Sequence, residues 1–254
     1  MTAAPDFAQT NARTLDQDEV DRFARLASEW WDPAGKFRTL HQIGPARLGY
    51  IRDELVRHFQ RPSSSMRPYA GLSLLDIGCG GGLISEPLAR LGGQVTGLDP
   101  AIENIEAARR HAAGQGLAID YVNATVEDLQ KQSRQFDAVV CLEVVEHVPD
   151  VGAFLKSCAA LVRPGGLMLL STLNRTMKAY LLAIIGAEYV LRWLPVGTHQ
   201  WDRFVTPDEL SAHLSSAGLG QFACVGLVYN PLADTWSIGG DTDVNYMARA
   251  AKPA

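Results

Sequence analysis

Residues 74–82 read LLDIGCGGG, an apolar run that enters a glycine-rich turn. The run is typical of a buried strand, and backbone without side chains can approach a ligand closely where such a turn meets a helix. A dinucleotide-binding turn carries a third glycine where this chain has Leu83. Such turns also rarely place an acid on the strand, whereas Asp76 lies two residues before Gly78. The Asp76 carboxylate and the Gly78 carbonyl would attract an ammonium group and would repel a phosphate.

A second apolar run, Gln94 to Leu98, ends at Asp99. An acid in this place can accept hydrogen bonds from both hydroxyls of a ribose. A turn glycine or a helix-capping acid would explain either feature alone. The two features at this spacing predict a site for a nucleoside-containing cofactor.

Strand and helix patterns alternate on both sides of this stretch. Strands are expected at 73–77, 94–98, 118–122, 136–142, 167–171, 222–228 and 244–248, and helices at 83–91, 102–113 and 150–161. A further helix should begin after Thr206, which forms a capping box with Glu209. The pattern predicts an α/β, Rossmann-like, doubly wound and mostly parallel seven-stranded sheet in a single domain over residues 16–254.

The N-terminal part precedes this alternation. Residues 1–15 are expected to be a disordered tail, and residues 16–68 a helical lid. The lid should contain one helix over 16–31, which Asp32–Pro33 ends, and another over 46–59.

Composition narrows the function classes. The 254 residues are 47% hydrophobic and 20% charged, with a net charge of −5 and no basic stripe, so nucleic acid is not expected as a partner. The four cysteines lie far apart, which argues against a zinc cluster or a disulfide framework: Cys79, Cys141, Cys158 and Cys224. The N-terminus lacks the pattern of a signal or transit peptide. We therefore expect a cytoplasmic, bacterial protein.

The chain resembles the class I S-adenosylmethionine-dependent methyltransferases, and within them the ubiquinone-biosynthesis O-methyltransferases. The resemblance begins near Phe23 and rests on these stretches: SEWWDPAGKFRTLHQIGPARLGYI (28–51), LLDIGCGGG (74–82), EVVEHVPD (143–150), STLNRT (171–176), GAEYVLRWLPVGTH (186–199) and DVNYM (243–247). It implies S-adenosyl-L-methionine as the cofactor. It also implies O-methylation of polyprenylated phenols or quinols at two steps of ubiquinone synthesis, and membership of a biosynthetic complex.

The resemblance also assigns cofactor contacts. Arg47 would bind the methionine carboxylate, a role that suits a planar guanidinium. Gly78 would hold the amino end and Asp99 the ribose, while Leu142 would lie against the adenosyl group. Asp76 is also expected to bind the cofactor, because its place on the strand brings a carboxylate close to the glycine turn. Without the resemblance, Arg47 would be taken for a surface ion pair.

A phenol needs a base or a metal to form its phenolate near neutral pH. Glu143, Glu146 and His147 follow the fourth strand beside the expected cleft, and His147 and Glu143 are the candidate catalytic residues. If a helix begins here, all three side chains share a face and could bind magnesium (Mg2+). The alternative is that both acids merely begin a helix and His147 packs locally. His199 is a weaker candidate base.

Residues 176–198 form a hydrophobic insertion. Between 177 and 196 the charged residues are Lys178, Glu188 and Arg192, and Gly186 and Pro195 also interrupt the apolar run, so a membrane span is not expected. The charges share one helical sector. The insertion is either a buried helix pair over the active site or an interfacial helix on the inner membrane. We favour peripheral membrane contact, because the implied acceptor carries a long isoprenoid tail.

Two rival functions stay open from the sequence. One is a class I methyltransferase for another small phenolic or carbon acceptor. The other is a non-catalytic lipid- or cofactor-binding subunit that keeps the cofactor turn.

Overall fold

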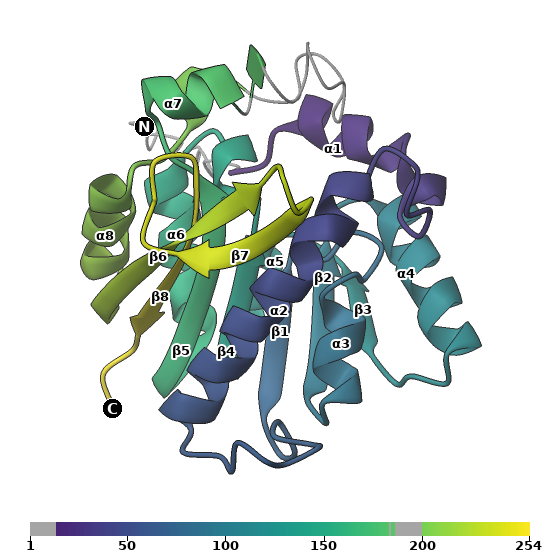
Figure 1. Ribbon diagram of the computed structural model, residues 1–254. Coiled ribbons are helices and arrows are strands. Elements are labelled where there is room, and N and C mark those ends of the chain that lie inside the picture. Colours follow the sequence, from purple (N-terminus) through teal and green to yellow (C-terminus); the bar gives the residue numbers. More distant parts are fainter. Residues whose placement is uncertain (1–13, 183, 186–199) are drawn as a thin grey trace, which may run out of the picture.

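An eight-stranded sheet in the order β3-β2-β1-β4-β5-β8-β6-β7 forms the centre of the protein in the computed structural model, which describes residues 14–182, 184–185 and 200–254 (Figure 1). The strands are β1 (Ser73–Ile77), β2 (Gln94–Asp99), β3 (Asp120–Asn123), β4 (Phe136–Leu142), β5 (Val162–Leu173), β6 (Gly220–Asn230), β7 (Thr235–Gly239) and β8 (Asn245–Ala251). The five strands from β3 to β5 are parallel, and β8, β6 and β7 continue the sheet in antiparallel pairs.

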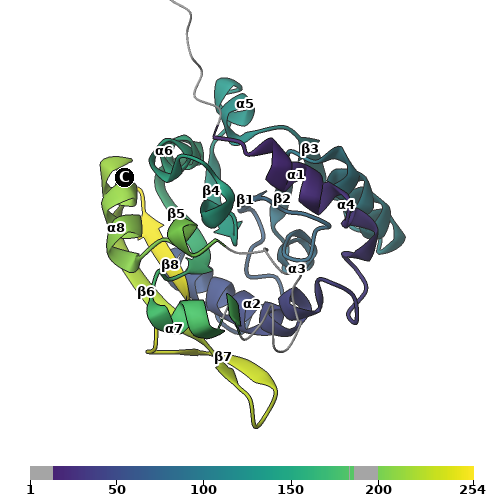
Figure 2. The same ribbon diagram turned by 90° about the horizontal axis from the view of Figure 1, so that it is seen from above.

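Helices cover both faces of this sheet. They are α1 (Gln17–Ala24), α2 (Arg38–His58), α3 (Ser85–Arg90), α4 (Ile102–Gly114), α5 (Val126–Lys131), α6 (Val151–Leu161), α7 (Met177–Ala179) and α8 (Pro207–Ser216). Figure 2 shows α5, α6 and α8 along one side of the strands and α2 and α3 on the other. Because both faces are covered, the central strand β4 is buried from Phe136 to Cys141.

The predicted α/β, doubly wound architecture is confirmed, with one strand more than the seven expected. The additional strand is β7, which pairs with the end of β6 as a hairpin. Its residues are largely exposed, so they lack the apolar pattern by which the other strands are recognised. The short helix α5 was not predicted either, although Thr125 caps its start by accepting from the Asp128 N–H.

The N-terminal segment 16–68 divides into two parts. A first part, α1 and the 3-10 turn η1 (Ala27–Glu29), lies above the ends of the strands. The expected helix over 16–31 is thus interrupted after Ala24. The second part is α2, which begins at Arg38 rather than near residue 46 and packs Ile51 and Leu55 against the sheet. Only part of this segment can therefore act as a lid.

Most residues of the expected tail and of the expected insertion are not among those that the structure describes. Of the tail 1–15, residues 1–13 lie outside the described residues, as do 183 and 186–199 of the insertion, with His199 among them. No described helix is both long enough and apolar enough to cross a membrane.

The capping box that begins α8 is present as predicted. The Glu209 backbone N–H donates to Thr206 Oγ1 at 3.2 Å, and the Thr206 N–H donates to Glu209 Oε2 at 3.0 Å. Thr206→Ala leaves the Glu209 N–H without its acceptor, so we expect about 1 kcal/mol lower stability in urea unfolding. Thr206→Ser, which keeps the hydroxyl, should unfold like the wild type. An unchanged midpoint for Thr206→Ala would show that the cap contributes nothing.

Candidate active site

A cavity of about 840 Å³ opens where the parallel strands β1, β2 and β4 end. This is where ligands bind in open α/β sheets. Every proposed residue that the structure describes lines it, which leaves out only His199: Arg47, Asp76, Gly78, Asp99, Leu142, Glu143, Glu146 and His147. The structure therefore brings the cofactor candidates and the catalytic candidates into one space.

The glycines of the turn after β1 serve different purposes. Gly78 lines the cavity with a φ of +68°, and a Cβ there would lie 2.5 Å from Val144 Cγ2. A Cβ on Gly80 or Gly81 would instead overlap the Trp30 ring. All three glycines make room for a protein side chain, Gly78 for Val144 and Gly80 and Gly81 for Trp30, but of the three only Gly78 also lines the cavity.

Asp76 is a buried acid at the floor of the cavity. It is 3% exposed, and the Ser85 hydroxyl donates to its Oδ2 at 2.6 Å. Burial raises the pKa of Asp76 to about 7, although the Ser85 hydrogen bond opposes this shift. A cationic group placed beside it would favour the carboxylate.

Asp99, at the end of β2, already accepts hydrogen bonds from the protein. Its Oδ2 accepts from the Gly80 N–H, and its Oδ1 accepts from the Ala101 N–H and from Asn104 Nδ2. A carboxylate has about four acceptor positions, so three are in use. In this arrangement one ribose hydroxyl can be accepted, and both can be accepted only if one of these donors moves away.

Trp30 connects the N-terminal segment to this acid. Its Nε1 donates to Asn104 Oδ1 at 2.8 Å, and its ring stacks on Phe37 with centroids 3.8 Å apart. The next residue, Trp31, donates to the Gly81 carbonyl at 2.9 Å. These contacts hold the segment against the glycine turn and close this side of the cavity.

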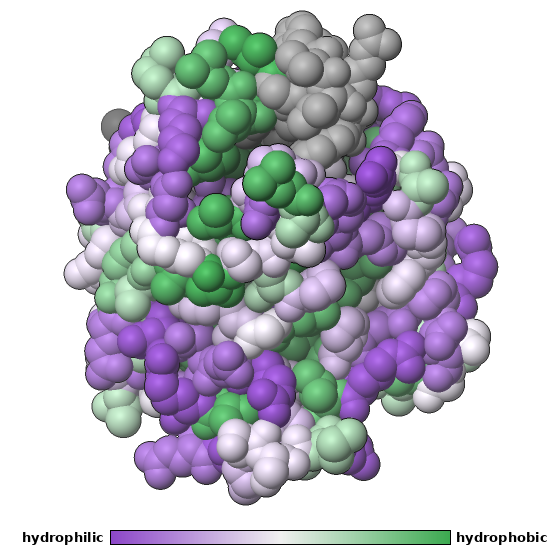
Figure 3. Space-filling model, viewed as in Figure 1, coloured by the Kyte–Doolittle hydropathy of each residue, from purple (hydrophilic) through white to green (hydrophobic). Residues whose placement is uncertain are grey.

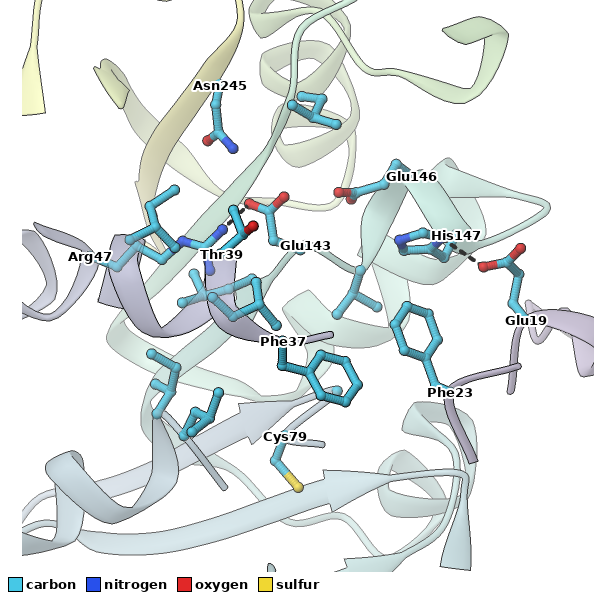
Figure 4. Close-up of a pocket in the computed structure, with 18 of the residues that line it drawn as sticks. Glu19, Phe23, Phe37, Thr39, Arg47, Cys79, Glu143, Glu146, His147 and Asn245 are labelled. Atoms are coloured by element: carbon cyan, nitrogen blue, oxygen red, sulfur yellow. Dashed lines mark ion pairs between the residues drawn. The ribbon is translucent and has the colours of Figure 1, made fainter. Parts of the chain in front are cut away.

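Arg47 forms an ion pair inside the cavity wall. Its Nη2 lies 2.7 Å from Glu143 Oε1, and both side chains are largely buried (Figure 4). The surface ion pair considered from the sequence is therefore wrong. Arg47 Nε is buried with no hydrogen-bond partner among the described residues, so this guanidinium has an unused donor for an anion.

Glu146 is the most deeply buried of the three catalytic candidates. Thr172 Oγ1 donates to its Oε2 at 3.0 Å, while Oε1 is buried with no partner among the described residues. Burial, reinforced by the charge of Glu143, raises the pKa of Glu146 well above its ordinary value. Its protonated form is therefore favoured more strongly than that of an exposed glutamate.

His147 is held by two residues of α1. Its Nδ1 lies 2.9 Å from Glu19 Oε2, and the Phe23 ring meets its edge with centroids 5.4 Å apart (Figure 4). Burial raises the pKa of Glu19, but hydrogen bonding and charge from His147 outweigh this effect and leave the pKa below its ordinary value. Glu19 therefore orients the ring as an ionised carboxylate and leaves Nε2 to accept a proton.

The expected magnesium site is not formed by these residues. No described group of three or more His, Cys, Asp or Glu side chains is arranged to hold a metal. The expectation assumed a helix from Glu143, but Glu143 has a φ of +54° and only the 3-10 turn η2 (Val145–His147) follows. The side chains consequently take separate partners, and Ser171 Oγ also donates to Glu143 at 2.6 Å. They do not fit a cation in this arrangement, so no step is assigned to one.

Sequence reasoning missed three residues of this site. Glu19 and Asn104 have no motif of their own, because their roles depend on partners that are distant in the sequence or across a turn. Trp30 lies in the SEWW stretch, residues 28–31. This stretch contributed to the family resemblance, but no contact in the site was predicted for either tryptophan.

The chain is similar to known methyltransferases. Residues 75–170 match a family model described as a methyltransferase domain. The chain is 52% identical over 254 residues to a ubiquinone biosynthesis O-methyltransferase of Rhodopseudomonas palustris, with both chains fully covered. It is 54% identical over 248 residues to the Brucella anthropi protein of that name, with 98% of this chain and 100% of the relative covered.

Solved structures share the fold at low sequence identity. Magnesium protoporphyrin IX methyltransferase from Synechocystis matches with a TM-score of 0.63 and 19% identity, over 91% of this chain and 94% of that one. A Thermotoga maritima methyltransferase, described as a possible histamine N-methyltransferase, matches with a TM-score of 0.62 and 17% identity, over 93% and 100% of the two chains.

Proposed function

This chain belongs to the ubiquinone biosynthesis O-methyltransferase family, and from that premise we propose that it methylates phenolic hydroxyls on polyprenylated catechol and quinol intermediates, at both O-methylation steps of the pathway. It is an S-adenosylmethionine-dependent methyltransferase. The observation that carries the proposal is one cavity that joins an acid just before the glycine turn, a buried arginine and a histidine paired with a carboxylate.

The cavity fits the cofactor. S-adenosylmethionine supplies an activated methyl group on a sulfonium. We propose that Asp76 and the Gly78 carbonyl bind its ammonium and that Arg47 binds its carboxylate through the unused Nε donor. Asp99 would bind the ribose and Leu142 would pack on the adenosyl group. Holding the two reactants in line supplies much of the rate enhancement in such a displacement.

His147 is the proposed proton acceptor. Its Nδ1 is engaged by Glu19, so Nε2 takes the phenolic proton as the oxygen attacks the methyl group. Glu143 remains tied to Arg47 and Ser171 and would position the acceptor ring beside the cofactor. Glu146 is buried, and in its protonated form it would donate a hydrogen bond to an acceptor oxygen.

Assays with two acceptors test this function. A short-chain polyprenyl catechol and a short-chain demethylquinol should both be methylated. Asp99→Ala should reduce both rates by the same factor, because both steps would use the same cofactor site. Methylation of neither compound by the wild type would overturn the proposal.

We propose a cytoplasmic protein that contacts the inner membrane through residues 177–196, beside other enzymes of its pathway. In the described part of this segment, Met177, Leu181, Leu182 and Ile185 are 65%, 52%, 54% and 38% exposed. Figure 3 shows hydrophobic side chains gathered over α7. Exposed apolar patches of this kind mark interaction sites.

Liposome binding tests the membrane contact. We expect wild-type protein to co-sediment with anionic liposomes and Leu181→Ser/Ile185→Ser to remain in solution, because both side chains are exposed and would lose apolar contact with lipid. Ile184 is left unchanged, since it packs against Leu173 and Phe204. Met66→Ser is the control, because Met66 is 86% exposed in the loop between α2 and β1. Equal sedimentation of the double variant and the wild type would argue against the membrane contact.

The Asp76 carboxyl should make cofactor affinity depend on pH. Its pKa is about 7, and the ammonium binds the ionised form, so affinity should fall about tenfold per pH unit well below pH 7. The stability of the cofactor-free protein should change with pH in the opposite sense. The folded state keeps the Asp76 proton that the unfolded state loses at the ordinary pKa of an aspartate, so this contribution to stability is lost as pH rises from that range to about 7. Calorimetric titrations from pH 5.5 to 8 measure the cofactor affinity. In Asp76→Asn this affinity should no longer change with pH. A wild-type affinity that does not change with pH would contradict the role of Asp76.

A further inference from the structure

The cavity extends well beyond the residues proposed for the cofactor. Its far end lies between the described start of the insertion and the β6–β7 hairpin, where it is lined by Leu182, Leu227, Tyr229, Pro231 and Trp236. No role in the site has been assigned to these residues. One of them, Trp236, lies on β7, the strand that was not predicted from the sequence.

This end of the cavity is built by specific contacts. The loop after β7 crosses β6 so closely that a Cβ on Gly226 would lie 1.8 Å from the Asp241 carbonyl oxygen. The Lys178 ammonium pairs with Asp241 and lies 3.4 Å from Asp243, which ties α7 to the same loop. The hairpin and α7 are thereby held as two facing walls.

The chemistry of these walls is apolar. Trp236 and Tyr229 contact each other with ring centroids 5.2 Å apart. Trp236 Nε1 is buried and finds no hydrogen-bond partner in the described part of the chain. The charged lining residues here, Lys178 and Asp241, pair with each other. Other parts of the cavity wall hold Asp76, Asp99 and the Arg47–Glu143 pair, so the cavity as a whole suits a molecule with both a polar and an apolar part.

We infer that the walls formed by α7 and the β6–β7 hairpin bind the first isoprene units of the acceptor's tail. This inference rests on the proposed function and extends it, because it assigns a place to the tail. Isoprene units are apolar and each carries a single methyl branch, so a polyprenyl chain is slim enough to lie between two walls, and an aromatic pair offers a large apolar contact area. Trp236 and Leu182 then determine specificity for tailed over tailless acceptors.

Leu182 and Leu181 provide a matched test. They are adjacent and almost equally exposed, at 54% and 52%, but only Leu182 lines the cavity. The measured quantity is the ratio of kcat/KM for a catechol with two isoprene units to kcat/KM for the tailless catechol, without lipid. Leu182→Asp should lower this ratio about tenfold, the scale for losing apolar contacts in a pocket. Leu181→Asp should keep the wild-type ratio, since Leu181 is not among the residues that line the cavity.

A second pair on β7 repeats the test. Trp236→Ala should lower the same ratio about tenfold, whereas Ile238→Ala, on the same strand but outside the cavity lining, should not. Wild-type ratios in both Leu182→Asp and Trp236→Ala would overturn the inference. A fall in Leu181→Asp equal to that in Leu182→Asp would do the same. Absence of any catechol methylation by the wild type would instead overturn the proposed function, so the two failures are distinguishable.

Discussion

Gly78→Val is expected to abolish S-adenosylmethionine binding without unfolding the protein. Gly78 has a φ of +68°, and a Cβ there would lie 2.5 Å from the Val144 side chain. The added methyl groups would also occupy the cavity where the methionine end of the cofactor is proposed to bind. A left-handed backbone costs a residue with a side chain roughly 1–2 kcal/mol, which is small beside the 5–15 kcal/mol stability typical of a domain.

Gly71→Val is the matched control for this experiment. Gly71 also has a positive φ, +79°, but a Cβ there meets nothing within 4 Å. Gly71→Val therefore shares the backbone strain without the obstruction. Calorimetric titration should show wild-type affinity for Gly71→Val and no binding for Gly78→Val. Wild-type affinity in Gly78→Val would contradict the assignment of the cofactor site.

His147→Ala is expected to lower kcat by about 10²–10⁴-fold, the usual contribution of a positioned base. The cofactor affinity should change little, because His147 contacts Glu19 and Phe23 rather than the proposed cofactor residues. Glu19→Gln should have a smaller effect on kcat, because an amide can still orient the ring but carries no charge. Rates are measured with saturating cofactor and a short-chain catechol. A kcat for His147→Ala within twofold of the wild type would exclude His147 as the base.

Exhaustive chelation separates a base from a metal ligand. The arrangement of Glu143, Glu146 and His147 predicts full wild-type activity after chelation, since each side chain is held by a protein partner. A loss that added magnesium restores in the wild type, but not in Glu143→Gln, would show that the three side chains rearrange around a cation.

The sequence predicted the elements whose burial is strong. Strands such as β1 and β4 are covered on both faces, so their apolar runs are nearly continuous and easily recognised. Strand β7 is exposed along much of its length, so its composition carries no such pattern. The helix expected over 16–31 breaks after Ala24, where Trp30 and Trp31 contact the glycine turn instead of continuing one helical face.

The residues of the candidate site were likewise predictable only where local sequence determines their place. Asp76, Gly78 and Asp99 could be proposed because their positions at strand ends place them at one edge of the sheet. Pairings between distant segments could not be read from the sequence, and the pairs Arg47–Glu143 and Glu19–His147 are of this kind. The magnesium expectation failed for a local reason, because it required a helix where the backbone at Glu143 turns left-handed.

Locating the transferred methyl group tests the central claim most directly. Purified protein is incubated with methyl-labelled S-adenosylmethionine and a short-chain polyprenyl catechol, and the product is examined by mass spectrometry and NMR. The account predicts one labelled methyl group on a phenolic oxygen, with none transferred by Gly78→Val. Label on a ring carbon, or no transfer by wild-type protein that binds the cofactor, would contradict it.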